Sequence, residues 1–452
     1  MLKKRLFAVL LAVLVLGGLI AAPVSAAGYP LPEGVKVNAP AAILVSLAGN
    51  PENDVVIYEK DADMVHAPGS MMRYMVLAHA LTCVKEKGLN LDRTTGTYTS
   101  DLFNKYVAGT GVNTANMNFG ETWTLRDLLT VSFMQSASDA VAVLATTVDE
   151  SVPEFIKGMN ELADTLGCDY SHFANLTGLD SLSQYTTARD MYKIVRYCQS
   201  FSEFEDLAVA YQVTVKPKEG GTERTIVSSN NLLQPSSTYR YSPIVHSRTG
   251  LSEHEGRACA SVARDSGYEY LVVVMGCPEQ NKAGETNLHY LDTIALLKWG
   301  FSRFEYKTVL GKSEILSTLP VELNWNTDHV NLVPAKEIST VVDANMGMEQ
   351  IIRKITVYEK SVNAPVEKGT VYGKVELIIN VDQKIGEVDL VAADSLSSNW
   401  ILVAWSKVSG FFGSGWFIAG VILLVVLIIA YIILNIVHNR RRRRQRQRIN
   451  RR

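Results

Sequence analysis

The chain has 452 residues, of which 47% are hydrophobic and 20% are charged, and its formal net charge is −2. This length exceeds a single typical core and favours two domains. The near-neutral total hides an asymmetry, because twelve basic residues and no acid lie at the two ends, so residues 27–439 carry a formal charge of −14. An acidic body argues against nucleic acid as a partner.

Residues 1–26 have the pattern of a secretory signal peptide. A basic start, Met1 to Arg5, is followed by an apolar stretch from Leu6 to Ile20 and by small residues up to Ala27. This order of segments is typical of a signal that is cleaved on export. The same stretch also fits a membrane anchor that is retained.

Residues 28–305 mix helical and strand patterns in a way that predicts an α+β domain. Apolar residues at helical spacing gather between early and late strand-like runs, which favours an antiparallel sheet over alternating βαβ units. The predicted helices cover residues 69–87, 124–134, 138–148, 153–166, 187–200 and 286–304, and the predicted strands cover residues 41–47, 54–59, 258–264 and 269–276.

Ser70 is the first candidate for chemistry. Pro68 and Gly69 end a loop, and an apolar helix follows, so Ser70 lies in the first turn, near the positive end of the helix dipole. Arg73 is three residues further and is therefore expected on the same face, within contact. On its own, Ser70 is better explained as a helix N-cap, because serine is a preferred cap.

Two later groups of polar residues are further candidates for a functional site with Ser70. Ser136 and Ser138 lie at the junction of two predicted helices, where serines are usually caps. Arg248, Thr249 and Gly250 precede the predicted strand pair at 258–276, and by themselves they indicate a turn.

The five cysteines outside the signal segment predict buried free thiols. They are Cys83, Cys168, Cys198, Cys259 and Cys277, and none belongs to a CxxC pair. A turn near Ser266 would place Cys259 opposite Val274, so the register does not favour a Cys259–Cys277 disulfide. No zinc-ligand spacing is present, and we expect neither a metal nor a cofactor.

The hydrophobic pattern changes after Tyr306, where short runs of alternating apolar and polar residues replace the long apolar stretches typical of helices. Residues 306–395 therefore predict a small β-rich domain, and residues 396–415 a juxtamembrane linker.

Residues 416–438 are predicted to cross a membrane. Trp416 to Val437 is an almost wholly apolar stretch of 22 residues, and about 20 are needed to span a bilayer. Residues 439–452 form an arginine-rich tail with nine arginines, which the positive-inside rule keeps in the cytoplasm. We therefore expect a single-pass membrane protein whose bulk lies outside the cytoplasm.

Together, Ser70-x-x-Arg73, Ser136-x-Ser138 and Arg248-Thr249-Gly250 resemble the active-site boxes Ser-x-x-Lys, Ser-x-Asn and Lys-Thr-Gly of penicillin-recognising enzymes. With their flanking stretches, over roughly residues 36–395, they are most similar to the D-alanyl-D-alanine carboxypeptidases of peptidase family S11. The resemblance implies a β-lactamase-like or DD-peptidase-like domain of helices packed on an antiparallel sheet. It also implies peptidoglycan D-Ala-D-Ala peptides as substrates and β-lactams as further ligands.

The resemblance implies roles for these residues. Ser70 would attack the peptide carbonyl and form an acyl-enzyme, with Ser136 as a proton shuttle. Backbone N–H groups of Ser70 and of the strand after Gly250 would hold the oxyanion. Ser138, Arg248, Thr249 and Gly250 would bind substrate.

The three differences from the family boxes are expected to affect function to different degrees. Arg248 in place of lysine should have little effect on substrate binding, because arginine binds carboxylates well. Ser138 in place of asparagine shortens the reach to the substrate amide. Arg73 in place of lysine should affect catalysis most, because a guanidinium stays protonated and cannot accept the serine proton. His66 and His79 are the nearest stand-ins, and both are better explained as ordinary histidines.

Two hypotheses remain open at this point. The first is a membrane-anchored carboxypeptidase homologue with weakened catalysis. The second is a non-catalytic relative that binds cell-wall peptide, or a protein partner, through the same groove.

Overall fold

The computed structural model describes residues 28–208, 211–379, 383–412 and 415–449, so the predicted signal peptide lies outside the described residues. The chain divides into two compact units. The first contains the chain up to Lys307 together with the short segments Thr340–Ile352 and Ile378–Ile385, and the second contains most of the remainder.

A five-stranded antiparallel sheet forms the centre of the first unit. Its strand order is β2-β1-β9-β8-β7, so β7 lies at one edge. The strands are β1 (Ala41–Ser46), β2 (Val55–Lys60), β7 (Ile244–Ser252), β8 (Gly256–Asp265) and β9 (Tyr268–Cys277).

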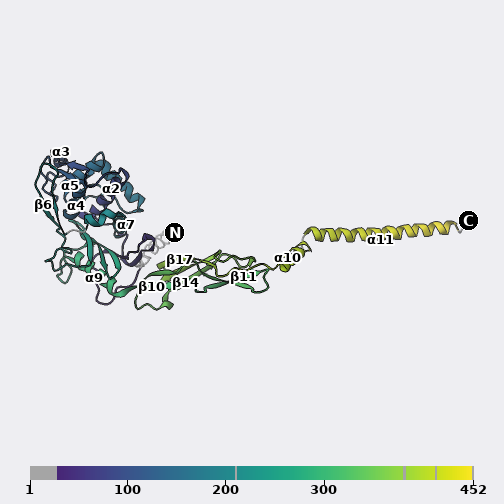
Figure 1. Cartoon of the computed structure of the whole chain (residues 1–452). Coiled ribbons are helices and arrows are strands. Elements are labelled where there is room, and N and C mark those ends of the chain that lie inside the picture. Colours follow the sequence, from purple (N-terminus) through teal and green to yellow (C-terminus); the bar gives the residue numbers. More distant parts are fainter. Residues whose placement is uncertain (1–27, 209–210, 380–382, 413–414, 450–452) are drawn as a thin grey trace, which may run out of the picture. The chain divides into compact units, whose positions relative to one another are not determined.

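Helices cover both faces of this sheet. Alternate residues of the strands, such as Ile43 and Val273, join a core cluster with the helices α2, α4, α5, α6, α7 and α8. The other face packs against α9, where the Phe301 ring meets Tyr270 edge-on at 4.9 Å. Figure 1 shows α2, α4 and α5 grouped on one side of this unit and α9 on the opposite side. The result is a layered α+β fold, as the sequence predicts.

The larger helices of the first unit begin and end close to their predicted bounds. They are α2 (Arg73–Glu86), α4 (Leu125–Gln135), α5 (Ser138–Val148), α6 (Val152–Thr165), α7 (Ala188–Cys198) and α9 (Leu288–Arg303). Two short helices, α3 (Ser100–Tyr106) and α8 (Ser202–Ala208), were not predicted. A 3-10 turn, η2 (Gly69–Met72), forms the start of the helix predicted from residue 69.

The register expected for the cysteine pair is confirmed, because Cys259 lies opposite Val274 across β8 and β9. All five cysteines are buried free thiols, as predicted. One expectation for this region is wrong: residues 248–250, which by themselves indicate a turn, lie inside the edge strand β7. Pairing of Thr249 with Cys259 extends the predicted hairpin to a third strand.

The second unit is rich in β-structure. A six-stranded sheet has the order β14-β16-β17-β12-β11-β15. A two-stranded sheet pairs β10 with β13, and residues of both strands belong partly to the first unit. The strands are β10 (Phe304–Leu310), β11 (Ser317–Glu322), β12 (His329–Pro334), β13 (Ile338–Asp343), β14 (Ile352–Val357), β15 (Val362–Asn363), β16 (Val371–Ile379) and β17 (Gln383–Ala392).

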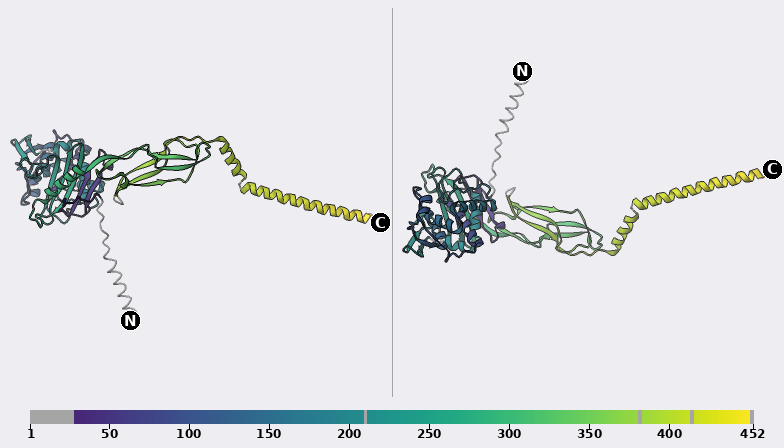
Figure 2. Two further views of the ribbon diagram at one scale, coloured as in Figure 1. Left: turned by 90° about the horizontal axis from the view of Figure 1, so that it is seen from below. Right: turned by 90° about the horizontal axis from the view of Figure 1, so that it is seen from above.

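Two helices follow the β-rich region. The segment predicted as a linker contains α10 (Trp400–Phe412), and α11 (Gly415–Ile449) includes the predicted span. Within α11, Gly415–Arg441 has a mean hydropathy of 3.3 and is long and apolar enough to cross a membrane. Figure 2 shows α11, in yellow, as one continuous helix. The C-terminal apolar helix therefore fits a single membrane anchor.

Asp292 of α9 fixes the segment that leads into β1. It is fully buried, and its two carboxylate oxygens accept hydrogen bonds from Asn38 Nδ2 at 2.8 Å and from Ala39 N at 2.7 Å. Asp292→Ala leaves both donors unsatisfied in the interior and should lower the free energy of unfolding by about 1–3 kcal/mol. Chemical denaturation measures this, with the exposed Asp169→Ala as the matched control. Equal stability of the two variants would contradict this role.

Candidate active site

Ser70 lies in the η2 turn, directly before α2, and its hydroxyl makes a hydrogen bond. Ser70 Oγ donates a hydrogen bond to the Thr249 carbonyl on β7, at 3.0 Å. The N-cap position of α2 belongs to Met72, and the cap position of η2 belongs to Pro68, neither of which makes a side-chain cap bond. The interpretation of Ser70 as an N-cap is therefore wrong, and its hydroxyl faces the strand that carries the third box.

Three glycines let the backbone close tightly around Ser70. A side chain on Gly250 would lie 2.1 Å from the Pro68 carbonyl oxygen. One on Gly69, which has a φ of +52°, would lie 2.5 Å from Leu251 N, and one on Gly178 would lie 2.8 Å from Ser70 N. The Ser70 turn is thus packed between β7 and the loop at residue 178, with the Leu251 amide close by.

Arg73 is fully buried, and its guanidinium is bound by oxygens of the second box and of the loop at 176–177. Its guanidinium donates to the carbonyls of Leu176, Thr177 (3.4 Å) and Ser136 (3.1 Å), and to Ser138 Oγ (3.1 Å). The Arg73 backbone N–H donates to the Ser70 carbonyl, so the two residues are in contact as expected, but among the described residues the guanidinium makes no hydrogen bond to Ser70 Oγ. Arg73 instead connects the start of α2 to the second box and to the loop at 176–177.

Arg248, on β7, also binds the second box, Ser136-x-Ser138, through Ser136. It is buried in the sheet edge and donates to Ser136 Oγ and, at 3.0 Å, to the Met134 carbonyl. Its guanidinium also lies 5.4 Å from the centre of the Phe133 ring. Ser136 adopts a left-handed conformation at the end of α4, with φ 55°, which presents its carbonyl to Arg73 and its hydroxyl to Arg248.

The two arginines make the site strongly electropositive. Neither guanidinium forms an ion pair with a described carboxylate, and Nε of each is buried without a partner. Burial, with the charge of Arg248 as the next cause, lowers the pKa of Arg73 to about 9. Burial likewise lowers the pKa of Arg248 to about 10. Both side chains therefore stay charged at neutral pH, and each repels the other.

Asp139 is the acid nearest to this pair, but its carboxylate is used by the backbone. It accepts hydrogen bonds from the amides of Ala115 (2.8 Å), Met117 (3.1 Å) and Ala140 (2.9 Å). The Ser138 amide donates to the Asn113 carbonyl at 2.8 Å. These bonds hold the 113–117 loop against the second box, which fixes Ser138 in reach of Arg73.

Neither histidine that could replace the missing lysine reaches Ser70. His66 Nδ1 lies 3.1 Å from a Glu255 carboxylate oxygen, and His79 Nε2 lies 2.8 Å from a carboxylate oxygen of Asp149. One ring nitrogen of each is thus used by a carboxylate, and neither histidine is hydrogen-bonded to Ser70 among the described residues.

Comparison with known proteins identifies the family. Residues 27–279 match the D-alanyl-D-alanine carboxypeptidases of peptidase family S11, and residues 304–398 match the C-terminal domain of penicillin-binding protein 5. This chain belongs to the D-alanyl-D-alanine carboxypeptidase family. The resemblance expected from the three boxes is confirmed.

Individual relatives align along most of the chain. The carboxypeptidase DacC of Escherichia coli is 26% identical over 87% of this chain and 91% of its own length. The carboxypeptidase DacF of Bacillus subtilis is 21% identical over 74% of this chain and 79% of its own. Among solved structures, penicillin-binding protein 5 of Haemophilus influenzae has a TM-score of 0.61 at 19% identity, covering 82% of this chain and all of that one. This last likeness shows the shared fold.

The structure brings all seven candidate residues of this S11 chain into one region. Ser70, Arg73, Ser136, Ser138, Arg248, Thr249 and Gly250 are connected by hydrogen bonds or by close backbone packing. Sequence reasoning missed the carbonyls of Leu176 and Thr177, because backbone acceptors leave no residue-type signal.

Gly250→Ala tests the packing of this site. Its Cβ would clash with the Pro68 carbonyl, and overpacking of this kind should destabilise the chain by about 1–3 kcal/mol. Gly311→Ala is the matched control, because a Cβ there meets nothing within 4 Å. Denaturation of both variants measures the difference. A Gly250→Ala variant as stable as the control would show that β7 can move away from the Ser70 turn.

Proposed function

We propose that this protein is a membrane-anchored S11 homologue that recognises D-Ala-D-Ala stem peptides of peptidoglycan, with acyl transfer from Ser70 strongly impaired. The single observation that carries this proposal is the arrangement of Arg73 and Arg248. Two buried guanidinium groups flank Ser136, and neither has a carboxylate partner among the described residues.

Substrate recognition follows from the electropositive site. A stem peptide ends in a carboxylate, and a buried, unneutralised guanidinium attracts such an anion more strongly than an exposed one. Arg248 and the half-buried Thr249 lie side by side on β7, in the positions of the family's third box. They would bind the terminal carboxylate, while Ser138 would contact the peptide amide.

The elements for oxyanion stabilisation are also retained. Ser70 lies at the start of a 14-residue helix, and Leu251 N lies close to the Ser70 turn. The amides of Ser70 and Leu251 would donate to the oxygen of a tetrahedral intermediate. Ser70 would form the acyl-enzyme, which water would release.

Proton transfer is the step that the substitution impairs. A base must accept the Ser70 proton, and a lysine in this setting would be moved by burial toward neutral pH. Arg73 starts from a higher pKa, and its pKa of about 9 keeps it protonated at pH 7. It also donates every observed hydrogen bond to an oxygen other than Ser70 Oγ. Loss of a general base typically costs about 10²- to 10⁴-fold in rate.

We propose that this site lies outside the cytoplasm. The arginines that follow the apolar helix α11 favour a cytoplasmic C-terminus, so the two folded units would lie on the other side of the membrane. That side is where peptidoglycan peptides occur. Residues 1–26 would serve as the export signal.

The alternative is a relative that binds peptide or a protein partner without any acylation. The Ser70–Thr249 hydrogen bond favours it, because the hydroxyl proton points to a backbone carbonyl that cannot act as a base. The two candidates differ only in whether Ser70 ever becomes acylated.

Labelling with a fluorescent penicillin separates the two. The full chain in detergent should label about 10²- to 10⁴-fold more slowly than the Arg73→Lys variant, because only the lysine can accept the serine proton. Ser70→Ala should abolish labelling. The exposed Arg126→Lys, which alters a surface pair with Asp92, is the matched control and should label like the wild type.

Other labelling or binding results would contradict parts of the proposal. Rapid wild-type labelling that disappears in Ser70→Ala would contradict the impairment. Labelling only after Arg73→Lys would favour the binding-only alternative. A stem peptide that binds neither the wild type nor the Ser70→Ala variant in calorimetry would overturn recognition itself.

A further inference from the structure

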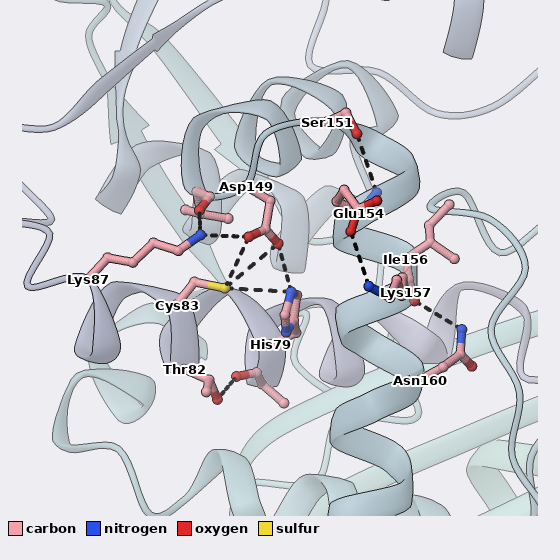
Figure 3. Close-up of polar contacts among 12 residues, drawn as sticks. His79, Thr82, Cys83, Lys87, Asp149, Ser151, Glu154, Ile156, Lys157 and Asn160 are labelled. Carbon is pink, nitrogen blue, oxygen red and sulfur yellow. Dashed lines mark hydrogen bonds and ion pairs between the residues drawn. The ribbon is translucent and has the colours of Figure 1, made fainter.

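A histidine, a cysteine and an aspartate converge between the C-terminal half of α2 and the C-terminal end of α5. His79 and Cys83 are four residues apart on α2, so they lie on one face of that helix, and Asp149 follows the last residue of α5. One ligand atom from each lies within 4.8 Å of the other two. Figure 3 shows the three side chains pointing toward one another, with Lys87 approaching Asp149 from the side.

We propose that His79, Cys83 and Asp149 bind one Zn²⁺ ion. Imidazole nitrogen, thiolate sulfur and carboxylate oxygen are the ligand types that zinc prefers. The structure contains no ion, and sequence analysis predicts no metal, because the three residues have no zinc-motif spacing and come from two helices.

The separations of the ligand atoms are close to those of a tetrahedral site. Typical zinc–ligand bonds imply about 3.5 Å for N···S, about 3.3 Å for N···O and about 3.5 Å for S···O. The observed values are 3.5 Å from Cys83 Sγ to His79 Nε2, 2.8 Å from Nε2 to Asp149 Oδ2, and 3.8 Å from Sγ to either carboxylate oxygen. Side-chain shifts of a few tenths of an ångström would complete the geometry.

The imidazole is held in place by α6. A Cβ on Gly158 would lie 2.2 Å from the His79 ring, so only a glycine leaves room for the imidazole. The Phe155 ring packs edge-on against His79 at 4.7 Å. A ligand that is already oriented loses little freedom on binding, which favours a metal site.

Lys87 competes with a metal for the Asp149 carboxylate. Its Nζ donates to Asp149 Oδ1 at 2.7 Å and also to the Val148 carbonyl. The Lys87 side chain is 46% exposed, so it can turn into solvent and leave a fourth position for water. Binding would replace the thiol proton of Cys83 with a sulfur–zinc bond and release that proton to solvent.

The proposed ion would stabilise the scaffold of the active site. α2 begins with Arg73 and α5 begins with Ser138, and their other ends meet at this cluster. A metal bridging them would fix the spacing of the two helices that carry the first and second boxes. The proposal does not depend on whether Ser70 is catalytically active.

Zinc and cobalt binding to the full chain in detergent test the proposal. After treatment with a chelator, the protein should bind one Zn²⁺ per chain in competition with a chromogenic chelator. Co²⁺ should give a thiolate-to-cobalt absorption band. Cys83→Ser and His79→Gln should each weaken zinc binding by about tenfold or more, and Cys83→Ser should remove the cobalt band.

Two further variants keep the proposal falsifiable if those fold poorly. Cys277→Ser is the matched control, because that buried thiol also lies beside a carboxylate, 3.9 Å from Asp292 Oδ2, and it should bind zinc like the wild type. Lys87→Ala removes a competing ammonium and should bind zinc about two- to fivefold more tightly. Less than one bound zinc in both the wild type and Lys87→Ala would overturn the site, as would equal effects of Cys83→Ser and Cys277→Ser.

Discussion

A guanidinium group that has lost all contact with water must find its hydrogen-bond acceptors inside the protein, and the candidate site depends on how Arg73 does so. From the first turn of α2 it donates to Ser136, Ser138, Leu176 and Thr177, which belong to two segments far away in the sequence. A buried cation left without acceptors costs several kilocalories per mole, so the second box and the 176–177 loop must stay close to α2. Arg248 on the edge strand β7 is also buried, so its acceptors at the end of α4, Met134 and Ser136, must stay close to β7.

This arrangement explains how the site keeps its shape with an arginine in the first box. In the family, the lysine of the first box must accept a proton, and burial helps by disfavouring its charge. Burial acts on Arg73 in the same direction, but from a higher starting pKa, so the charge remains. The guanidinium then serves as a donor to carbonyl oxygens. The result is a site that holds two buried, positively charged guanidinium groups.

The helices that carry these residues are themselves fixed at both ends. At the active-site end, Arg73 and Ser138 join α2 to α5 through a hydrogen bond. At the other end, His79, Cys83 and Asp149 bring the same two helices together, with Lys87 balancing the carboxylate. Although burial favours the protonated carboxyl, the bonds from Lys87 and His79 lower the pKa of Asp149. Polar contacts at two distant points thus set the separation of helices whose intervening surfaces are apolar.

The sequence by itself determined the elements and the family. Apolar periodicity located the major helices, the alternation and turn near Ser266 fixed Cys259 opposite Val274, and the apolar run after Trp416 indicated the span. These features are local, since each depends on neighbours within a few residues. Only the tertiary structure decided what the polar side chains do. Ser70 is no cap, because its hydroxyl donates to the Thr249 carbonyl 179 residues away, and the Arg73 guanidinium binds the Ser136 carbonyl 63 residues away. Residues 248–250 are a strand because they pair with β8. Backbone carbonyl acceptors are present at every residue, so no sequence pattern reveals which one a buried arginine will choose.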